Sequence, residues 1–198
     1  MALKTFVKVS GVNNLSDARY CAGMEVNHIG FNIESSHPNY TSAQDYKELS
    51  EWLSGVEFVG EITSSDSDIL ALLADYDVHA IQVEDLAQVD TALTSGKEVI
   101  FATDDLDAAE KAWSASGEKL KYVLFDPSKT ALDAIATAAL STPIVLAGGF
   151  TDEDVEGKID SLNLFGIAMK GGDEIRPGYK DFDALADILE ALEIDDLA

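Results

Sequence analysis

Short apolar runs rich in β-branched residues alternate along this chain with longer stretches in which apolar residues recur every three to four positions. The first pattern is typical of buried parallel strands, and the second indicates amphipathic helices. The expected strands are residues 5–9, 28–33, 56–62, 78–83, 98–102, 121–125, 143–147 and 164–169. The expected helices are residues 15–23, 42–53, 66–75, 86–94, 105–116, 130–139, 152–159 and 182–192. Each expected strand is therefore followed by an expected helix.

The number of strand–helix units decides between two α/β architectures. Eight units in 198 residues leave about 25 residues for each, which is near the lower size limit of a closed (β/α)8 barrel and long for a five-stranded doubly wound sheet. Neither a linker nor a low-complexity tract divides the chain. We therefore predict one compact (β/α)8 barrel domain over residues 1–198. The expected helix N-caps are Ser16, Thr41, Asp66, Asp104 and Thr151.

The overall charge narrows the classes of partner. Thirteen Lys and Arg stand against 37 Asp and Glu, which gives a formal net charge of −24. Such a surface repels phosphate backbones and anionic lipid, so nucleic-acid and membrane partners are not expected. A single cysteine cannot form an intramolecular disulfide, the first residues lack a signal-peptide core, and no apolar run approaches ~20 residues. These features predict a cytoplasmic protein.

In a barrel, the residues that follow each strand form the active site. Residues 8–18 span the end of the first expected strand and the loop after it, and residues 30–40 and 146–150 do the same for the second and seventh strands. Residues 170–181 follow the eighth. Taken in order, these segments resemble the phosphoribosylanthranilate isomerase family of tryptophan biosynthesis, whose members are small (β/α)8 barrels. The resemblance runs along nearly the whole chain.

The resemblance implies an Amadori rearrangement, in which an aminoaldose phosphate becomes a ketose without a cofactor. The expected ligand is a small sugar phosphate, and the expected assembly is a monomer or homodimer. Such chemistry needs an acid beside the ring oxygen and a base beside the C2 proton. The family's acid ends the sixth strand, where this chain has Asp126. The alternative for Asp126 is a capping or turn residue before Pro127.

The family's base is the cysteine of a Lys-x-Cys-Gly motif, and this chain has Ser10 there, within Lys8–Gly11. A serine hydroxyl is a weak base unless a neighbouring base activates it, and no obvious helper adjoins Ser10 in the sequence. Misplacing one acid–base partner can cost roughly 10²–10⁴-fold in rate, so this change predicts a poor enzyme. Cys21 lies in an expected helix and is more typical of a buried core residue than of a displaced nucleophile.

Further departures from the family concern its substrate-binding loops. Asn39 stands in the place of an arginine that pairs with the anthranilate carboxylate, and Asn cannot replace that bidentate cation. Gln82 matches the family's strand-four Gln-Leu-His-Gly, but Glu84 and Asp85 replace its last two residues. Strands four and six have the same parity, so Glu84 and Asp126 could approach across the mouth and serve as base and acid.

The phosphate-binding end is closer to the family. Gly148 and Gly149 match it after the seventh strand, while Lys170, Gly171 and Gly172 occupy the corresponding place after the eighth. Glycine lets backbone N–H groups approach phosphate oxygens, so we expect these five residues to frame a phosphate site. The alternative is that such glycine pairs only form tight turns.

Three hypotheses for function follow. The chain is a working isomerase with an altered acid–base set, or a weak or silent paralogue that binds a phosphate ligand or a partner, or an isomerase or epimerase of another sugar phosphate. The three histidines, His28, His37 and His79, show no ligand spacing, so the sequence predicts no metal site.

Overall fold

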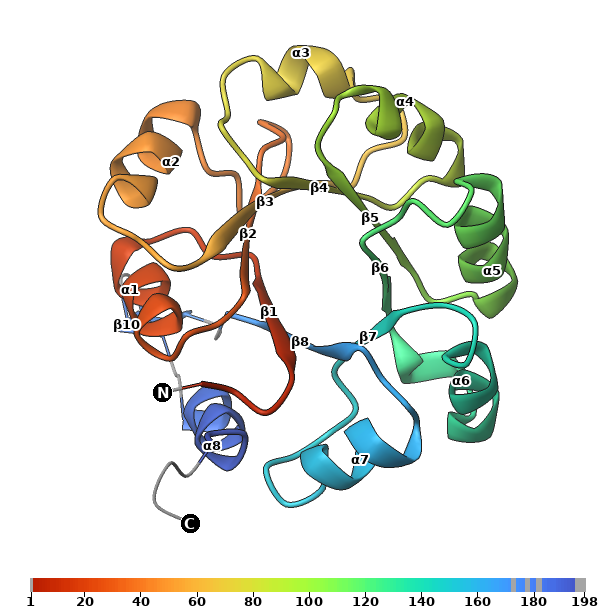
Figure 1. Ribbon diagram of the computed structural model, residues 1–198. Helices are drawn as coiled ribbons and strands as arrows, with labels where there is room; N and C mark the ends of the chain where they lie inside the picture. Colours follow the sequence, from red (N-terminus) through yellow and green to blue (C-terminus); the bar gives the residue numbers. More distant parts are fainter. Residues whose placement is uncertain (1, 172–173, 177–178, 181–182, 195–198) are drawn as a thin grey trace.

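Eight parallel strands close into a barrel with helices around its outside (Figure 1). The computed structural model describes residues 2–171, 174–176, 179–180 and 183–194. The barrel strands are β1 (Phe6–Ser10), β2 (His28–Asn32), β3 (Glu57–Ile62), β4 (Ala80–Val83), β5 (Glu98–Thr103), β6 (Tyr122–Phe125), β7 (Ile144–Ala147) and β8 (Gly166–Lys170). The main helices are α1 (Leu15–Gly23), α2 (Ala43–Ser50), α3 (Ile69–Leu73), α4 (Val89–Thr94), α5 (Leu106–Ala115), α6 (Leu132–Ala138), α7 (Val155–Ser161) and α8 (Asp183–Ala191). The predicted (β/α)8 architecture is confirmed.

Along each strand, side chains point alternately into the barrel interior and outward to the surrounding helices. The interior cluster of strand side chains comprises Val59, Ala80, Ile100, Tyr122, Leu124, Val145 and Ala168. The intervening strand residues, such as Val7 and Ile29, pack against helix residues in the larger outer core. Cys21 of α1 belongs to that outer core and is fully buried, as expected from the sequence.

The observed N-caps of five helices lie one to three residues away from the N-caps that the sequence predicted. The structure places the corresponding caps at Asn14, Ser42, Asp68, Asp105 and Asp154. Thr41 shows the physical reason for one shift. The Thr41 side chain is buried, and the Thr41 backbone N–H donates to the carbonyl of Asn32 (2.8 Å). Residue 41 therefore still belongs to the segment that runs beside β2. The next hydroxyl along the chain, Ser42, is the one that accepts from the Asp45 N–H.

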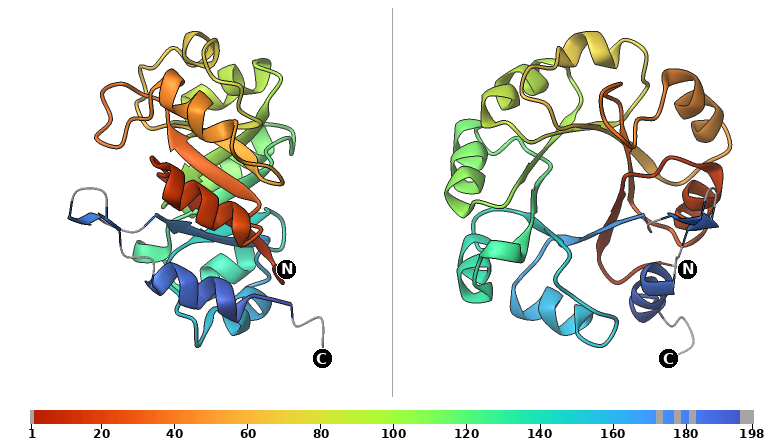
Figure 2. Two further views of the ribbon diagram at one scale, coloured as in Figure 1. Left: turned by 90° about the vertical axis from the view of Figure 1, so that its left-hand side faces the viewer. Right: turned by 180° about the vertical axis from the view of Figure 1, so that it is seen from behind.

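A short antiparallel hairpin, β9 (Glu174–Arg176) and β10 (Tyr179–Lys180), lies between β8 and α8 and was not expected from the sequence. Figure 2 shows it projecting from the end of the barrel at which β8 terminates. Among the described residues, no helix has the length and apolar character needed to cross a membrane.

Candidate active site

A buried ion pair lies between β1 and β3 near the C-terminal mouth of the barrel. Lys8 Nζ contacts Glu61 Oε1, and both side chains are almost completely buried. The other oxygen, Glu61 Oε2, accepts from the Gly11 N–H (3.1 Å). Between the two strands, β2 contributes Gly30, where any Cβ would overlap the Glu61 carboxylate. Glycine at position 30 therefore makes room for the pair.

This ion pair determines the chemical environment of Ser10. Lys8 Nζ also contacts Ser10 Oγ. Because Glu61 holds Lys8 as an ammonium, which has donors but no acceptor, Lys8 donates to the hydroxyl and does not withdraw its proton. The sequence had offered no helper for Ser10. The neighbour that the fold supplies stabilises negative charge on the Ser10 side chain without acting as a base.

Glu84 follows β4 at the solvent-exposed rim of the mouth. Partial desolvation raises the pKa of Glu84, and the nearby carboxylates of Glu61 and Glu34 raise it further, while Lys170 and His37 act in the opposite direction. Asp126 is not among the charges that shift the pKa of Glu84. In the described part of the chain, the charged groups that shift the pKa of Glu84 therefore lie toward β2, β3 and β8. The expected pairing with Asp126 is not among the causes of this pKa shift.

Asp126 follows β6 and is exposed. Its Oδ1 accepts from the Ser128 N–H (2.9 Å), which caps the 3-10 turn η2 (Pro127–Lys129). Asp126 therefore acts as the cap of this turn, which is the alternative role that the sequence left open. The position of Asp126 at the C-terminal end of its strand still matches that of the expected acid, and its acid role stays a prediction.

The two expected substrate-binding residues differ in their surroundings. Asn39 is exposed in the loop after β2, where its backbone N–H donates to His37 Nδ1 (3.1 Å). Gln82 lies on β4, is 5% exposed, and has a buried Oε1 without a hydrogen-bond partner among the described residues. An unsatisfied buried acceptor costs about 1–3 kcal/mol, so a bound ligand that donates a hydrogen bond to Gln82 Oε1 would remove this cost.

The expected phosphate site needs one correction. Gly148 and Gly149 have φ of +90° and +77° after β7, a conformation that favours glycine. The N–H of Gly171, however, donates to the carbonyl of Ser10 (3.0 Å) and is not available to a phosphate. Gly172 lies outside the described residues. Lys170 is exposed at the end of β8, close enough to Glu84 to lower its pKa.

A hollow of about 500 Å³ lies between the loops that follow β3, β4 and β5 and helix α5. It is lined by Thr63, Ser65, Glu84, Asp85, Leu86, Phe101, Thr103, Asp105 and Ala108. A second hollow of about 340 Å³ lies between the β2 and β3 loops and helices α2 and α3, away from Ser10 and Asp126. Of these two hollows, the larger is lined by Glu84, and neither is lined by Ser10, Gln82 or Asp126.

Glu34, which sequence reasoning missed, anchors the loop that forms one wall of the larger hollow. Its carboxylate is buried and accepts from Thr63 N (2.6 Å), Thr63 Oγ1 (2.8 Å), Ser64 N (3.1 Å) and Ser67 Oγ. Burial acts to raise the pKa of Glu34, but these hydrogen bonds outweigh it and the net pKa is lowered. No local motif indicates this role, because the donors come from the loop after the next strand.

We expect Glu34→Gln to destabilise the protein by about 1–3 kcal/mol at neutral pH, since an amide replaces a carboxylate that accepts several hydrogen bonds. A lowered folded-state pKa contributes stability that is present above the unfolded value of about 4.3 and is lost as pH falls through the folded value. The variant should therefore lose less stability than the parent on acidification below about pH 4.3. Urea unfolding across that range measures both effects, and parallel pH profiles would contradict the assignment.

The comparisons with known proteins agree with this architecture. The family model of N-(5'-phosphoribosyl)anthranilate isomerase matches residues 7–191. A relative of that name from Aquifex aeolicus is 24% identical over 200 residues, covering 93% of this chain and 96% of the relative. Another from Pelodictyon phaeoclathratiforme is 26% identical over 200 residues, covering 89% and 92% respectively.

Solved structures show the same fold. Monomers derived from the dimeric phosphoribosylanthranilate isomerase of Thermotoga maritima superpose with a TM-score of 0.77 at 24% identity, covering 95% of this chain and 98% of that one. A phosphoribosylanthranilate isomerase solved with reduced 1-(o-carboxyphenylamino)-1-deoxyribulose 5-phosphate gives a TM-score of 0.76 with the same coverage. The match of the family model over nearly all of the chain shows that it belongs to the N-(5'-phosphoribosyl)anthranilate isomerase family.

Proposed function

We propose that this chain rearranges an aminoaldose phosphate of the phosphoribosylanthranilate type to its ketose, with turnover far below that of family members that have the cysteine base. The observation that carries the proposal is Ser10, whose hydroxyl contacts an ammonium held by Glu61. The family's base position therefore holds a group that does not accept a proton readily.

The residual chemistry is assigned to two carboxyl groups. Asp126 protonates the ring oxygen as the furanose opens, and Glu84 takes the C2 proton. The raised pKa of Glu84 makes its carboxylate a stronger base than an ordinary carboxylate. The unpartnered Oε1 of Gln82 supplies an acceptor for a substrate hydroxyl or amine. Lys170 and the loop of Gly148 and Gly149 face the phosphate.

A steady-state assay with phosphoribosylanthranilate, on protein from a host that lacks its own isomerase, tests the proposal. Turnover should be measurable and about 10²–10⁴-fold below that of a cysteine-containing member assayed beside it. Turnover equal to that of the ordinary member would contradict the account of Ser10. Binding of a product analogue with no turnover would instead identify a ligand-binding paralogue. The presence of Ser10 in place of the family's cysteine and of Asn39 in place of its arginine makes this the second candidate function.

Replacing Asp126 by asparagine separates its two roles. Asparagine caps a turn about as well as aspartate, so the fold of η2 should be retained while the acid is lost. We expect Asp126→Asn to lower the residual kcat by about 10²-fold or more with little change in the unfolding midpoint. Asp68→Asn, which alters another capping carboxylate, is the matched control. Unchanged kcat in Asp126→Asn would show that Asp126 serves only as a cap.

Glu84→Gln tests the base. Removal of the carboxylate should reduce kcat by about 10²-fold or more, because the amide cannot accept the C2 proton. Asp85→Asn changes the neighbouring acid that lines the same hollow and should leave kcat within about twofold, as expected for a group that takes no part in proton transfer. Equal losses in the two variants would indicate that only the negative charge of the rim matters.

A further inference from the structure

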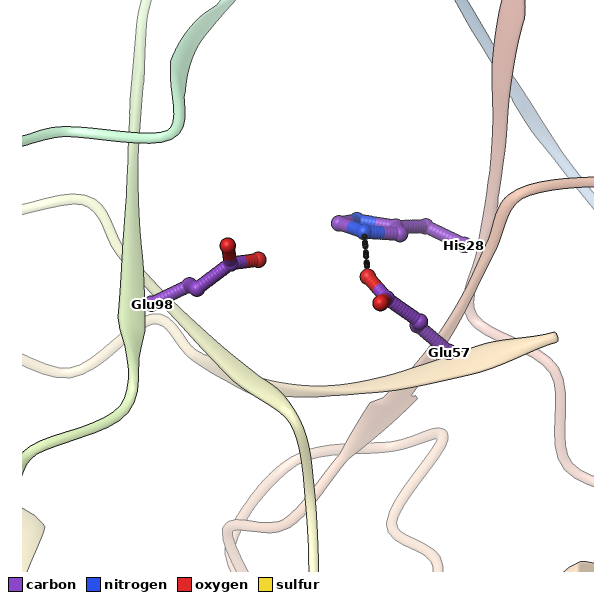
Figure 3. Close-up of side chains that lie close together, drawn as sticks. All are labelled: His28, Glu57 and Glu98. Atoms are coloured by element: carbon purple, nitrogen blue, oxygen red, sulfur yellow. Dashed lines mark hydrogen bonds and ion pairs between the residues drawn. The ribbon is translucent and has the colours of Figure 1, made fainter.

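The N-terminal end of the barrel, opposite the catalytic mouth, holds a cluster that the isomerase reaction does not use. His28, Glu57 and Glu98 are the first residues of β2, β3 and β5. Figure 3 shows their side chains converging on one point inside the barrel wall. One donor atom of each residue lies within 4.8 Å of the donor atoms of the other two. We propose that these three side chains bind a first-row transition-metal ion of the zinc class.

The imidazole of His28 is suited to a metal ligand. It is fully buried, its Nε2 lies 2.9 Å from Glu57 Oε2, and its Nδ1 lies 2.9 Å from the Tyr122 hydroxyl oxygen. Histidines that bind metal through one nitrogen usually donate the other N–H to a nearby acceptor, and the Tyr122 oxygen is placed to accept it. The imidazole therefore directs Nε2 toward the carboxylates and holds its other nitrogen at Tyr122, as in histidines that ligate metal.

The two carboxylates supply oxygen donors and a route to solvent. The Glu57 and Glu98 side chains retain 48% and 45% of their exposure, whereas His28 retains none. Zinc prefers four ligands at about 2.0–2.2 Å, so one nitrogen, two carboxylate oxygens and a water would complete a tetrahedral site. The half-exposed carboxylates can rotate into the ligand–ligand spacing of about 3.4 Å that such a site requires. The Glu57–His28 hydrogen bond would be replaced by metal bonds.

The local negative charge favours a cation, and the nitrogen ligand determines which type of cation is preferred. Among the described residues, Lys121 Nζ lies 2.9 Å from Glu98 Oε1, and Lys8, the other cation that acts on His28, is paired with Glu61. The remaining negative charge attracts a divalent ion. The nitrogen ligand disfavours calcium and magnesium, which prefer all-oxygen sites, and favours zinc, cobalt and nickel. Because the ligands come from three strands, the ion would tie β2, β3 and β5 together at the end of the barrel associated with stability rather than catalysis.

The test uses the full chain after chelation and dialysis, with zinc added in calorimetry and cobalt added in visible absorption. Excess magnesium is present throughout, because a chain of net charge −24 attracts cations non-specifically. We expect one zinc per chain, a higher unfolding midpoint with zinc, and the strong absorption of tetrahedral cobalt. Zinc binding that disappears under excess magnesium, or several weak ions per chain, would overturn the proposal.

Variants locate the ion. Glu98→Gln keeps the shape of a half-exposed side chain and should weaken zinc binding by at least tenfold, with loss of the zinc-dependent rise in unfolding midpoint. Glu156→Gln, which changes an exposed carboxylate paired with Lys4 elsewhere on the surface, should bind zinc like the parent. Equal affinity in Glu98→Gln and the parent would show that the ion binds elsewhere and that His28, Glu57 and Glu98 form only a hydrogen-bonded cluster. The isomerase assay does not enter this test, so either proposal can fail alone.

Discussion

Glu61→Leu should destabilise the protein by about 3–5 kcal/mol, because it leaves the Lys8 ammonium in the barrel interior without its counter-charge. Lys8 is fully buried and Glu61 is 6% exposed, so water does not compensate the lost partner. The Gly11 N–H loses its acceptor at the same time. Denaturant unfolding followed by circular dichroism measures the loss as a lower midpoint at constant slope.

The companion double variant distinguishes an uncompensated charge from a packing defect. Lys8→Met with Glu61→Leu removes both charges and keeps apolar volume, and replacing a buried ion pair by apolar residues is often neutral. We therefore expect the double variant to recover most of the stability lost in Glu61→Leu. Losses that simply add would show that the two side chains do not interact in the folded protein. Lys4→Met, which breaks the exposed pair with Glu156, is the control and should cost under about 1 kcal/mol.

The barrel could be predicted from the sequence because its signals are local. Each strand is a short apolar run followed by a helical pattern, and eight such units in a chain of this length favour closure. The helix starts were less predictable. Several candidate caps lie within three residues of one another, and tertiary contacts such as the hydrogen bond from Thr41 to Asn32 choose between them.

The contents of the sites were harder to predict because they depend on contacts between strands far apart in the chain. Lys8 and Glu61 are 53 residues apart, and nothing near either residue indicates the other. The same holds for Glu34 and the loop of Thr63 and Ser64. His28 lies 29 residues from Glu57, so the expectation of no metal site, drawn from spacing along the chain, did not test clusters formed by strand register.

Restoring the family's base and its carboxylate-binding cation together should raise turnover of phosphoribosylanthranilate more than either change alone. In Ser10→Cys, the thiol would stand beside the Lys8 ammonium, and a nearby cation lowers the pKa of a thiol and favours the thiolate. The single change should therefore raise kcat by about 10²-fold or more while KM stays high.

Asn39→Arg should act mainly on KM. Its guanidinium would pair with the anthranilate carboxylate, which the present rim, with Glu84 and Asp85, otherwise repels. The gain in kcat/KM of the combined Ser10→Cys and Asn39→Arg variant should exceed the product of the gains of the two single variants. The reason is that a substrate whose carboxylate is bound by the arginine is also oriented with its C2 proton toward the base. Steady-state kinetics of the four proteins resolves the split between kcat and KM. Ser10→Cys with unchanged kcat would show that position 10 does not reach the C2 proton and that Glu84 remains the base in both proteins.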